Sequence, residues 1–183
     1  SELVRLLHGF GGKQWRHKAY ELGGQKVGIV GLGRTGRMIA DVLRFLGAEV
    51  YYFSRTRKPD AEAAGMTFKP LPQLLADSEV VFTCLNKNVL LLGEAEFAQL
   101  GAGKVLFNTS IGPGFDSAAL EKWLDEPGTH FFCDTRAAAG PVAEDFFARK
   151  NVRCANVSAG RTKQAFVLLS KKVLDNIRTA LGE

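Results

Sequence analysis

Three glycines in the stretch GLGRTG (31–36) follow the GxGxxG spacing that lets a backbone approach a dinucleotide. An apolar run, KVGIV (26–30), precedes them, and the helical pattern RMIADVLRFLG (37–47) follows. In such a unit the glycines allow a tight turn, a close pyrophosphate and close helix packing, while the first helical N–H groups face the phosphates. The pattern predicts a dinucleotide site; the alternative is a glycine turn in a fold that binds nothing. The predicted contacts are Gly31, Gly33, Arg34, Thr35 and Gly36.

About 20 residues after the glycines, such a site usually carries a carboxylate for the adenosine ribose. Here the stretch is SRTRK (54–58), which has hydroxyls and cations instead. A 2′-phosphate on that ribose needs cations and donors, and a carboxylate would repel it. The sequence therefore predicts that NADP(H) is preferred over NAD(H), unless these cations belong only to a solvated loop. The predicted residues are Ser54, Arg55, Thr56, Arg57 and Lys58.

The elements that position these residues alternate between strand and helix. Several of the strand-like runs are apolar almost throughout, which is typical of strands covered on both faces. This alternation of strands and helices predicts an α/β fold, namely a Rossmann-type doubly wound parallel sheet in three layers. We expect residues 1–183 to form a single dinucleotide-binding domain. A weaker strand is predicted at 66–69. The main runs are KVGIV (26–30), EVYYF (49–53), EVVFTC (79–84), KVLFNT (104–109), THFFCD (129–134) and NVRCA (151–155).

Three segments do not belong to this alternation of strands and helices. Residues 1–10 indicate a short helix, and residues 136–150 a long irregular and mobile connection. Residues 161–181 indicate a long helix whose apolar stripe is predicted to pack on the sheet in preference to forming a partner groove. The stripe consists of Phe166, Leu169, Val173, Ile177 and Leu181.

Composition narrows the classes of function. The 24 Lys and Arg exceed the 19 Asp and Glu by five, but the basic residues are scattered, so no nucleic-acid module is expected. The apolar runs are too short to span a bilayer. The three cysteines include no CxxC pair and have apolar neighbours, so we expect reduced thiols, no metal site and a cytoplasmic protein. Because the chain starts at Ser1 without a signal sequence, we expect a piece of a longer protein.

Several longer stretches occur in a characteristic order: ELGGQKVGIVGLGRTGR, LPQLLADSEVVFTCL, GAGKVLFNTSIGPGFDSAALEKWL, FFCD and NVRCANVSAGRT. Together they resemble the NAD(P)-binding domain of the D-isomer-specific 2-hydroxyacid dehydrogenases, and SRTRK resembles the NADP-preferring glyoxylate and hydroxypyruvate reductase branch. The resemblance implies hydride transfer between the nicotinamide and a small 2-oxo or 2-hydroxy acid. It also implies a homodimer and a separate substrate domain, whose N-terminal part is absent from this sequence.

The resemblance implies further cofactor contacts and a diverged active centre. The contacts would come from Leu85, Thr109, Ser110 and Asp134, although Asp134 could equally cap a turn. The family's catalytic Arg, Glu and His positions fall on Ile111, Ala139 and Val157, so no catalytic residue is assigned. Two hypotheses remain: an oxidoreductase acting on CH–OH groups with an altered centre, and a non-catalytic NADP(H)-binding regulatory or subunit module.

Overall fold

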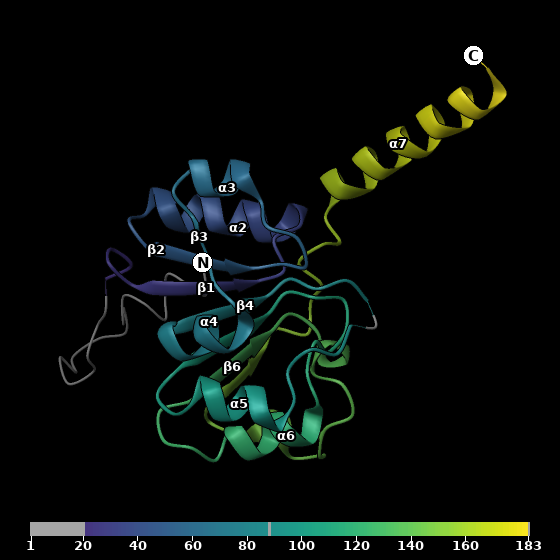
Figure 1. Ribbon diagram of the computed structural model, residues 1–183. Helices are drawn as coiled ribbons and strands as arrows, with labels where there is room; N and C mark the ends of the chain where they lie inside the picture. Colours follow the sequence, from purple (N-terminus) through teal and green to yellow (C-terminus); the bar gives the residue numbers. More distant parts are fainter. Residues whose placement is uncertain (1–20, 88, 183) are drawn as a thin grey trace.

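The computed structural model describes residues 21–87 and 89–182, and its centre is a seven-stranded parallel sheet (Figure 1). The strand order is β3-β2-β1-β4-β5-β6-β7, so the chain reverses its direction of travel across the sheet between β1 and β4. In sheets of this kind ligands bind at the carboxyl ends of the strands beside that reversal. The strands are β1 (Lys26–Val30), β2 (Glu49–Phe53), β3 (Thr67–Phe68), β4 (Val80–Thr83), β5 (Val105–Asn108), β6 (His130–Cys133) and β7 (Val152–Cys154).

Helices cover both faces of the sheet, which confirms the predicted three-layer Rossmann-type fold. Figure 1 shows α2 and α3 on one side of the sheet and α4, α5 and α6 on the other. The helices are α2 (Arg34–Phe45), α3 (Pro59–Ala63), α4 (Leu71–Asp77), α5 (Glu94–Leu100), α6 (Ser117–Trp123) and α7 (Lys163–Leu181). No helix in the described part of the chain is long and apolar enough to cross a membrane. The helix predicted over residues 1–10 lies outside the described residues.

A separate apolar core fills each side of the sheet. Alternate residues of β1 point to opposite faces, so Val27 and Ile29 join the core beneath α2, while Val30 joins the core beneath α4, α5 and α6. All three are at most 1% exposed. This two-sided burial explains why the central strands are apolar throughout.

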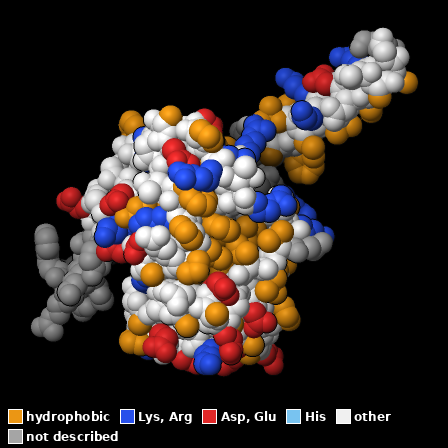
Figure 2. Space-filling model, in the orientation of Figure 1, with side chains coloured by type: hydrophobic (Ala, Val, Ile, Leu, Met, Phe, Trp, Pro, Cys, Tyr) orange, Lys and Arg blue, Asp and Glu red, His pale blue; other side chains and the backbone are white. Residues whose placement is uncertain are grey.

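Helix α7 does not pack on the sheet, so that prediction is wrong. Figure 1 shows α7 extending away from the domain, and none of its described residues is buried. Its stripe is open to solvent, with Phe166 63% and Ile177 49% exposed, and Figure 2 shows apolar side chains along one side of the helix. The apolar spacing identified the side of the helix that is suited to burial, but it held no information on the direction in which the helix leaves the sheet.

The segment 136–150 contains more regular secondary structure than the sequence predicted. It forms two 3₁₀ helices, η1 (Arg136–Ala139) and η2 (Phe146–Ala148). Ala138, Ala139 and Phe146 are fully buried, and the Arg136 guanidinium lies 4.9 Å from the centroid of the Phe147 ring. The prediction of an irregular connection is therefore wrong for these two helices, whose small and aromatic residues anchor the segment in the core, and the mobility of the segment stays a prediction.

The exposure of α7 leads to a stability prediction for this chain. Ile177→Ala is expected to change the free energy of unfolding by no more than about 0.5 kcal/mol, because the side chain is exposed on a helix none of whose described residues is buried. The matched core variant, Leu120→Ala, removes a fully buried side chain and should cost about 2–5 kcal/mol. Urea unfolding followed by circular dichroism measures both, and an equal loss in the two variants would contradict the exposed position of α7.

Candidate functional site

The glycine loop joins β1 to α2 at the carboxyl ends of the strands, and two of its glycines are required by packing. A Cβ atom at position 31 would lie 2.6 Å from the carbonyl oxygen of Cys84, and Gly31 has a φ of +101°. A Cβ atom at position 36 would lie 2.2 Å from the carbonyl oxygen of Gly31. Gly31 and Gly36 therefore allow the close contacts among β1, β4 and α2 that the GxGxxG pattern predicted.

Gly33 is different, because packing does not require a glycine there. A Cβ atom at position 33 would meet nothing within 4 Å, and its φ of −83° suits any residue. Gly33 is the N-cap of α2, no side chain caps this end of the helix, and Arg34 and Thr35 are exposed. An open backbone surface at the N-terminus of a twelve-residue helix fits an anionic pyrophosphate. The residues present therefore fit a dinucleotide.

The cationic loop 54–58 begins directly after β2, whose neighbour in the sheet is β1. The Ser54 hydroxyl donates to the carbonyl oxygen of Thr56 over 2.6 Å, and Arg55 is exposed. The Lys58 N–H donates to the Tyr52 hydroxyl over 2.8 Å. Arg57 is engaged in a side-on ion pair with Glu62 of α3. The structure thus brings the five predicted residues to one end of the sheet.

The ends of β4 and β5 hold the next group of predicted contacts. The Ser110 hydroxyl accepts from the Leu85 N–H over 2.9 Å, so these two residues fix each other. The Thr109 hydroxyl donates to the carbonyl oxygen of Thr83 over 2.9 Å and lies 3.2 Å from the Cys84 sulfur. Burial raises the pKa of the Cys84 thiol to about 11, so it stays protonated at neutral pH. Ser110 is 6% exposed and Thr109 is exposed, so Thr109 presents more surface to a ligand.

Asn108, which the sequence analysis did not single out, connects these loops. Its side-chain oxygen accepts from the Thr83 hydroxyl and the Ser110 N–H, each over 2.9 Å. Its amide nitrogen donates to the carbonyl oxygens of Ala138 over 2.7 Å and Gly112 over 3.1 Å. Asn108 is 2% exposed. The sequence did contain a signal for this role, because Asn108 is a polar residue at the end of the apolar run VLFN (105–108). A buried amide at such a position must find hydrogen-bond partners.

Asp134 follows β6 and already serves as an acceptor for the loop after β7. One carboxylate oxygen accepts from the Ala159 N–H over 3.0 Å, and the Asp134 carbonyl oxygen accepts from the Val157 N–H over 2.9 Å. The turn-capping role considered from the sequence is therefore real. Contact between Asp134 and the nicotinamide carboxamide stays a prediction.

The three positions that the resemblance assigns to catalysis lack ionisable side chains and are placed differently from one another. Ile111 is 77% and Val157 is 71% exposed, whereas Ala139 is fully buried in η1. His130 is the first residue of β6, so it lies at the amino ends of the strands, whereas the glycine loop lies at their carboxyl ends. Burial and the nearby Arg153 lower its pKa, so it is neutral at pH 7. Its position at the amino ends, and not its charge, prevents His130 from replacing a missing acid–base group at the carboxyl ends.

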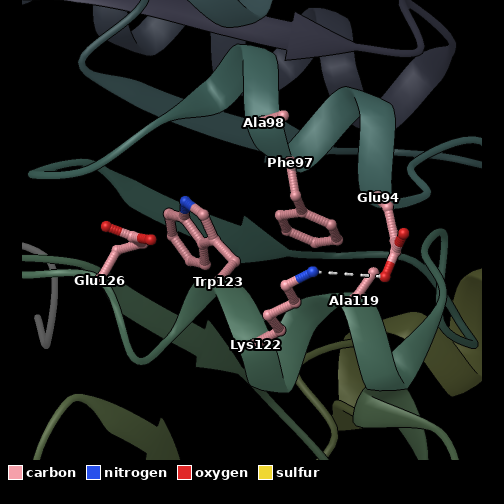
Figure 3. A pocket seen from close by; sticks show the side chains of 7 residues that line it. All are labelled: Glu94, Phe97, Ala98, Ala119, Lys122, Trp123 and Glu126. Atoms are coloured by element: carbon pink, nitrogen blue, oxygen red, sulfur yellow. Dashed lines mark ion pairs between the residues drawn. The ribbon is translucent and has the colours of Figure 1, made fainter.

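A surface hollow between α5 and α6 is separate from this site. Figure 3 shows Phe97 and Trp123 lining it, with the Lys122 ammonium 3.6 Å from the Glu94 carboxylate. The hollow lies between helices of one outer layer and contains none of the predicted contacts. Within residues 21–87 and 89–182, no group of three His, Cys, Asp or Glu side chains could hold a metal ion.

The comparisons identify the family of this chain. The model of the D-isomer specific 2-hydroxyacid dehydrogenase NAD binding domain matches residues 5–155. A glyoxylate reductase of Thermococcus litoralis is 32% identical over 174 residues, covering 90% of this chain and 51% of that protein. One of Aeropyrum pernix is 30% identical, covering 86% of this chain and 49% of that protein. The chain belongs to this family, contains its NAD-binding domain, and spans about half the length of these relatives.

Solved structures agree on the fold. A D-isomer specific 2-hydroxyacid dehydrogenase from Polaromonas superposes with a TM-score of 0.79 at 21% identity, covering 99% of this chain and 59% of that chain. The Salmonella D-lactate dehydrogenase has a TM-score of 0.74 at 22% identity, covering 96% of this chain and 59% of that chain. At these identities the likeness concerns the architecture alone.

Removing the Asn108 amide should destabilise the domain. Asn108→Ala leaves the Thr83 hydroxyl, the Ser110 N–H and two carbonyl groups without their partner, so we expect the free energy of unfolding to fall by about 2–4 kcal/mol. Urea unfolding measures this loss. The exposed Asn176→Ala serves as the control, and an Asn108 variant as stable as this control would refute the role of the amide.

Substitutions of the glycines should separate folding from ligand binding. Gly36→Ala places a methyl group against the Gly31 carbonyl and should lower the free energy of unfolding by about 1–3 kcal/mol. Gly33→Ala should lower the free energy of unfolding by no more than about 1 kcal/mol, the cost of Ala at an N-cap. It should weaken nicotinamide dinucleotide binding at least about tenfold, because the methyl group occupies the surface where the pyrophosphate approaches. Thermal unfolding and fluorescence titration provide the two measurements. Unchanged binding by Gly33→Ala would reject the assignment of this loop.

Proposed function

We propose that this chain is the NADP(H)-binding domain of a D-2-hydroxyacid dehydrogenase-like oxidoreductase whose active centre has diverged. The observation that carries the proposal is the open glycine at position 33 beside the cationic loop 54–58, at the carboxyl ends of β1 and β2. Packing explains Gly31 and Gly36 in any fold of this type, but it gives no reason for a glycine at position 33. A pyrophosphate lying against the backbone does give such a reason.

The preference for NADP(H) over NAD(H) rests on charge. The loop after β2 has no carboxylate within residues 54–58, and Arg55 and Lys58 form no ion pair among the described residues. A doubly charged 2′-phosphate gains charge-assisted hydrogen bonds from such groups, whereas an unmodified ribose does not. Thr56 adds a hydroxyl donor beside the cations, and Ser54 would add a second one by giving up its hydrogen bond to the Thr56 carbonyl oxygen.

We propose an altered active centre because the three positions that the resemblance assigns to catalysis do not provide the groups that the reaction requires. A substrate carboxylate needs a fork of donors, the transferred proton needs a group that titrates near neutrality, and that group needs an acceptor to fix its tautomer. Ile111, Val157 and Ala139 supply none of these. A bound nicotinamide supplies the hydride, and this domain would orient it through Thr109 and Asp134. The groups that act on a 2-oxo acid would then come from elsewhere in the protein.

A non-catalytic NADP(H)-binding regulatory or subunit module is the second candidate, and it is favoured by the burial of Ala139. A Glu side chain at this position would require the surrounding core to move. The proposed active centre would therefore differ from the family's in the packing around position 139 as well as in its ionisable groups. Under either function we propose that the protein is a cytoplasmic homodimer. We also propose that a substrate-binding domain lies outside this sequence, since the matched glyoxylate reductases are about twice as long as the aligned region.

Cofactor titrations test the NADP(H) preference. In the full-length protein we expect the Kd for NADPH to be at least about tenfold below that for NADH, a difference of about 1.4 kcal/mol. Arg55→Gln should reduce the ratio, whereas Arg178→Gln, which removes a distant exposed cation on α7, should not. Tighter binding of NADH than of NADPH would overturn the preference.

Turnover assays separate the two candidate functions. NADPH oxidation by the full-length protein is measured with glyoxylate, hydroxypyruvate and other 2-oxo acids. Turnover with any of them supports the oxidoreductase and removes the regulatory module. Tight NADPH binding without oxidation supports the module. The 183-residue chain alone is expected to bind cofactor weakly and to turn over no substrate, because it spans only about half the length of the glyoxylate reductases that it matches.

A further inference from the structure

We propose that Glu62 is an internal competitor of the cofactor's 2′-phosphate, because its carboxylate occupies the Arg57 guanidinium to which that phosphate would bind. The inference rests on the NADP(H) preference proposed above. It makes Glu62 a residue that sets the strength of the preference from outside the loop 54–58. Glu62 would act through Arg57 and without contacting the cofactor.

The contacts of Glu62 are specific. Its Oε1 atom accepts from Arg57 Nε over 3.0 Å and from the Tyr52 hydroxyl over 2.8 Å, and its Oε2 atom accepts from Arg57 Nη2. Tyr52 is fully buried at β2, so it anchors the carboxylate to the sheet. The guanidinium also lies over the Phe68 ring, 5.2 Å from the centroid. Arg57 is therefore held by two side chains, Glu62 and Phe68, and Tyr52 holds Glu62 in place, before any ligand arrives.

Glu62 occupies the N–H groups of Arg57 through which a guanidinium binds an anion most strongly. A guanidinium binds a carboxylate or phosphate most strongly through two parallel N–H groups, and Glu62 already takes the Nε and Nη2 pair. The ion pair also has no net charge. A phosphate beside it would be attracted by Arg57 and repelled by Glu62 at nearly the same distance.

Glu62 keeps this charge under ordinary conditions. Its hydrogen bond from Arg57 and then that from Tyr52 lower the pKa of the carboxyl group below its usual value. The carboxylate is thus ionised throughout the neutral range. The side chain of Arg57 is 64% exposed, so a ligand can reach it once the pair opens.

The neighbouring Asp60 offers a comparison within the same helix. It lies two residues before Glu62 in α3, but its carboxylate pairs with Arg37 of α2 over 2.8 Å. Removal of either carboxylate changes the net charge of α3 by one. Only the removal of Glu62 releases Arg57, so the two variants separate local competition from a general charge effect.

The experiment measures binding of adenosine 2′,5′-bisphosphate and adenosine 5′-monophosphate to the full-length protein by calorimetry, which needs no turnover. Glu62→Gln keeps the size of the side chain and removes the charge. It should tighten adenosine 2′,5′-bisphosphate binding about 3- to 10-fold and leave adenosine 5′-monophosphate binding unchanged. Glu62→Asp, which retains the charge, and Asp60→Asn should each change the ratio of the two affinities by less than about twofold.

A second background tests whether Glu62 acts through Arg57. In Arg57→Gln the further change Glu62→Gln should alter the ratio by less than about twofold, because no guanidinium remains to be released. If Glu62→Gln weakens the bisphosphate, leaves it unchanged, or has the same effect without Arg57, competition by Glu62 is overturned. Weak or indifferent binding of the 2′-phosphate by the wild-type protein overturns the NADP(H) preference instead, and the competition with it.

Discussion

The carboxyl-end loops of this domain depend on one buried amide. Asn108 receives hydrogen bonds from β4 and from the loop after β5, and it donates to that loop and to η1. Since each of its polar atoms is paired away from water, a displacement of any one loop would leave a buried group without a partner. The end of β4, the loop after β5 and η1 are therefore positioned relative to one another before a ligand binds.

The residues of the candidate cofactor site fall into two groups, those that the packing of the fold requires and those that it does not. Gly31 and Gly36 are required by contacts among β1, β4 and α2, so they would persist in this fold whatever the site binds. Gly33 and the cations Arg55 and Lys58 carry no comparable packing requirement. They are consequently the more informative residues about ligand binding, although the motif is usually judged by all three glycines together.

The sequence predicted the parallel sheet, its strands and its three layers because apolar runs and helical spacing report burial directly. It also located the glycine loop and the cationic loop at the same end of the sheet. It missed Asn108 and Glu62, whose roles depend on partners 25 and 5 residues away in the chain. It misplaced α7 because a stripe of apolar side chains records which side of a helix is suited to burial, but not which way the helix points.

The burial of Ala139 limits how this protein could change in evolution. A side chain at Ile111 or Val157 can be exchanged on the surface, so an Arg or a His could appear at either position by a single substitution. A Glu at position 139 would enter a core that has no space for it, and its charge would be buried among apolar groups. If the active centre has diverged as proposed, a Glu at this position would need the segment 136–150 to be repacked first, so the change could not be reversed one residue at a time.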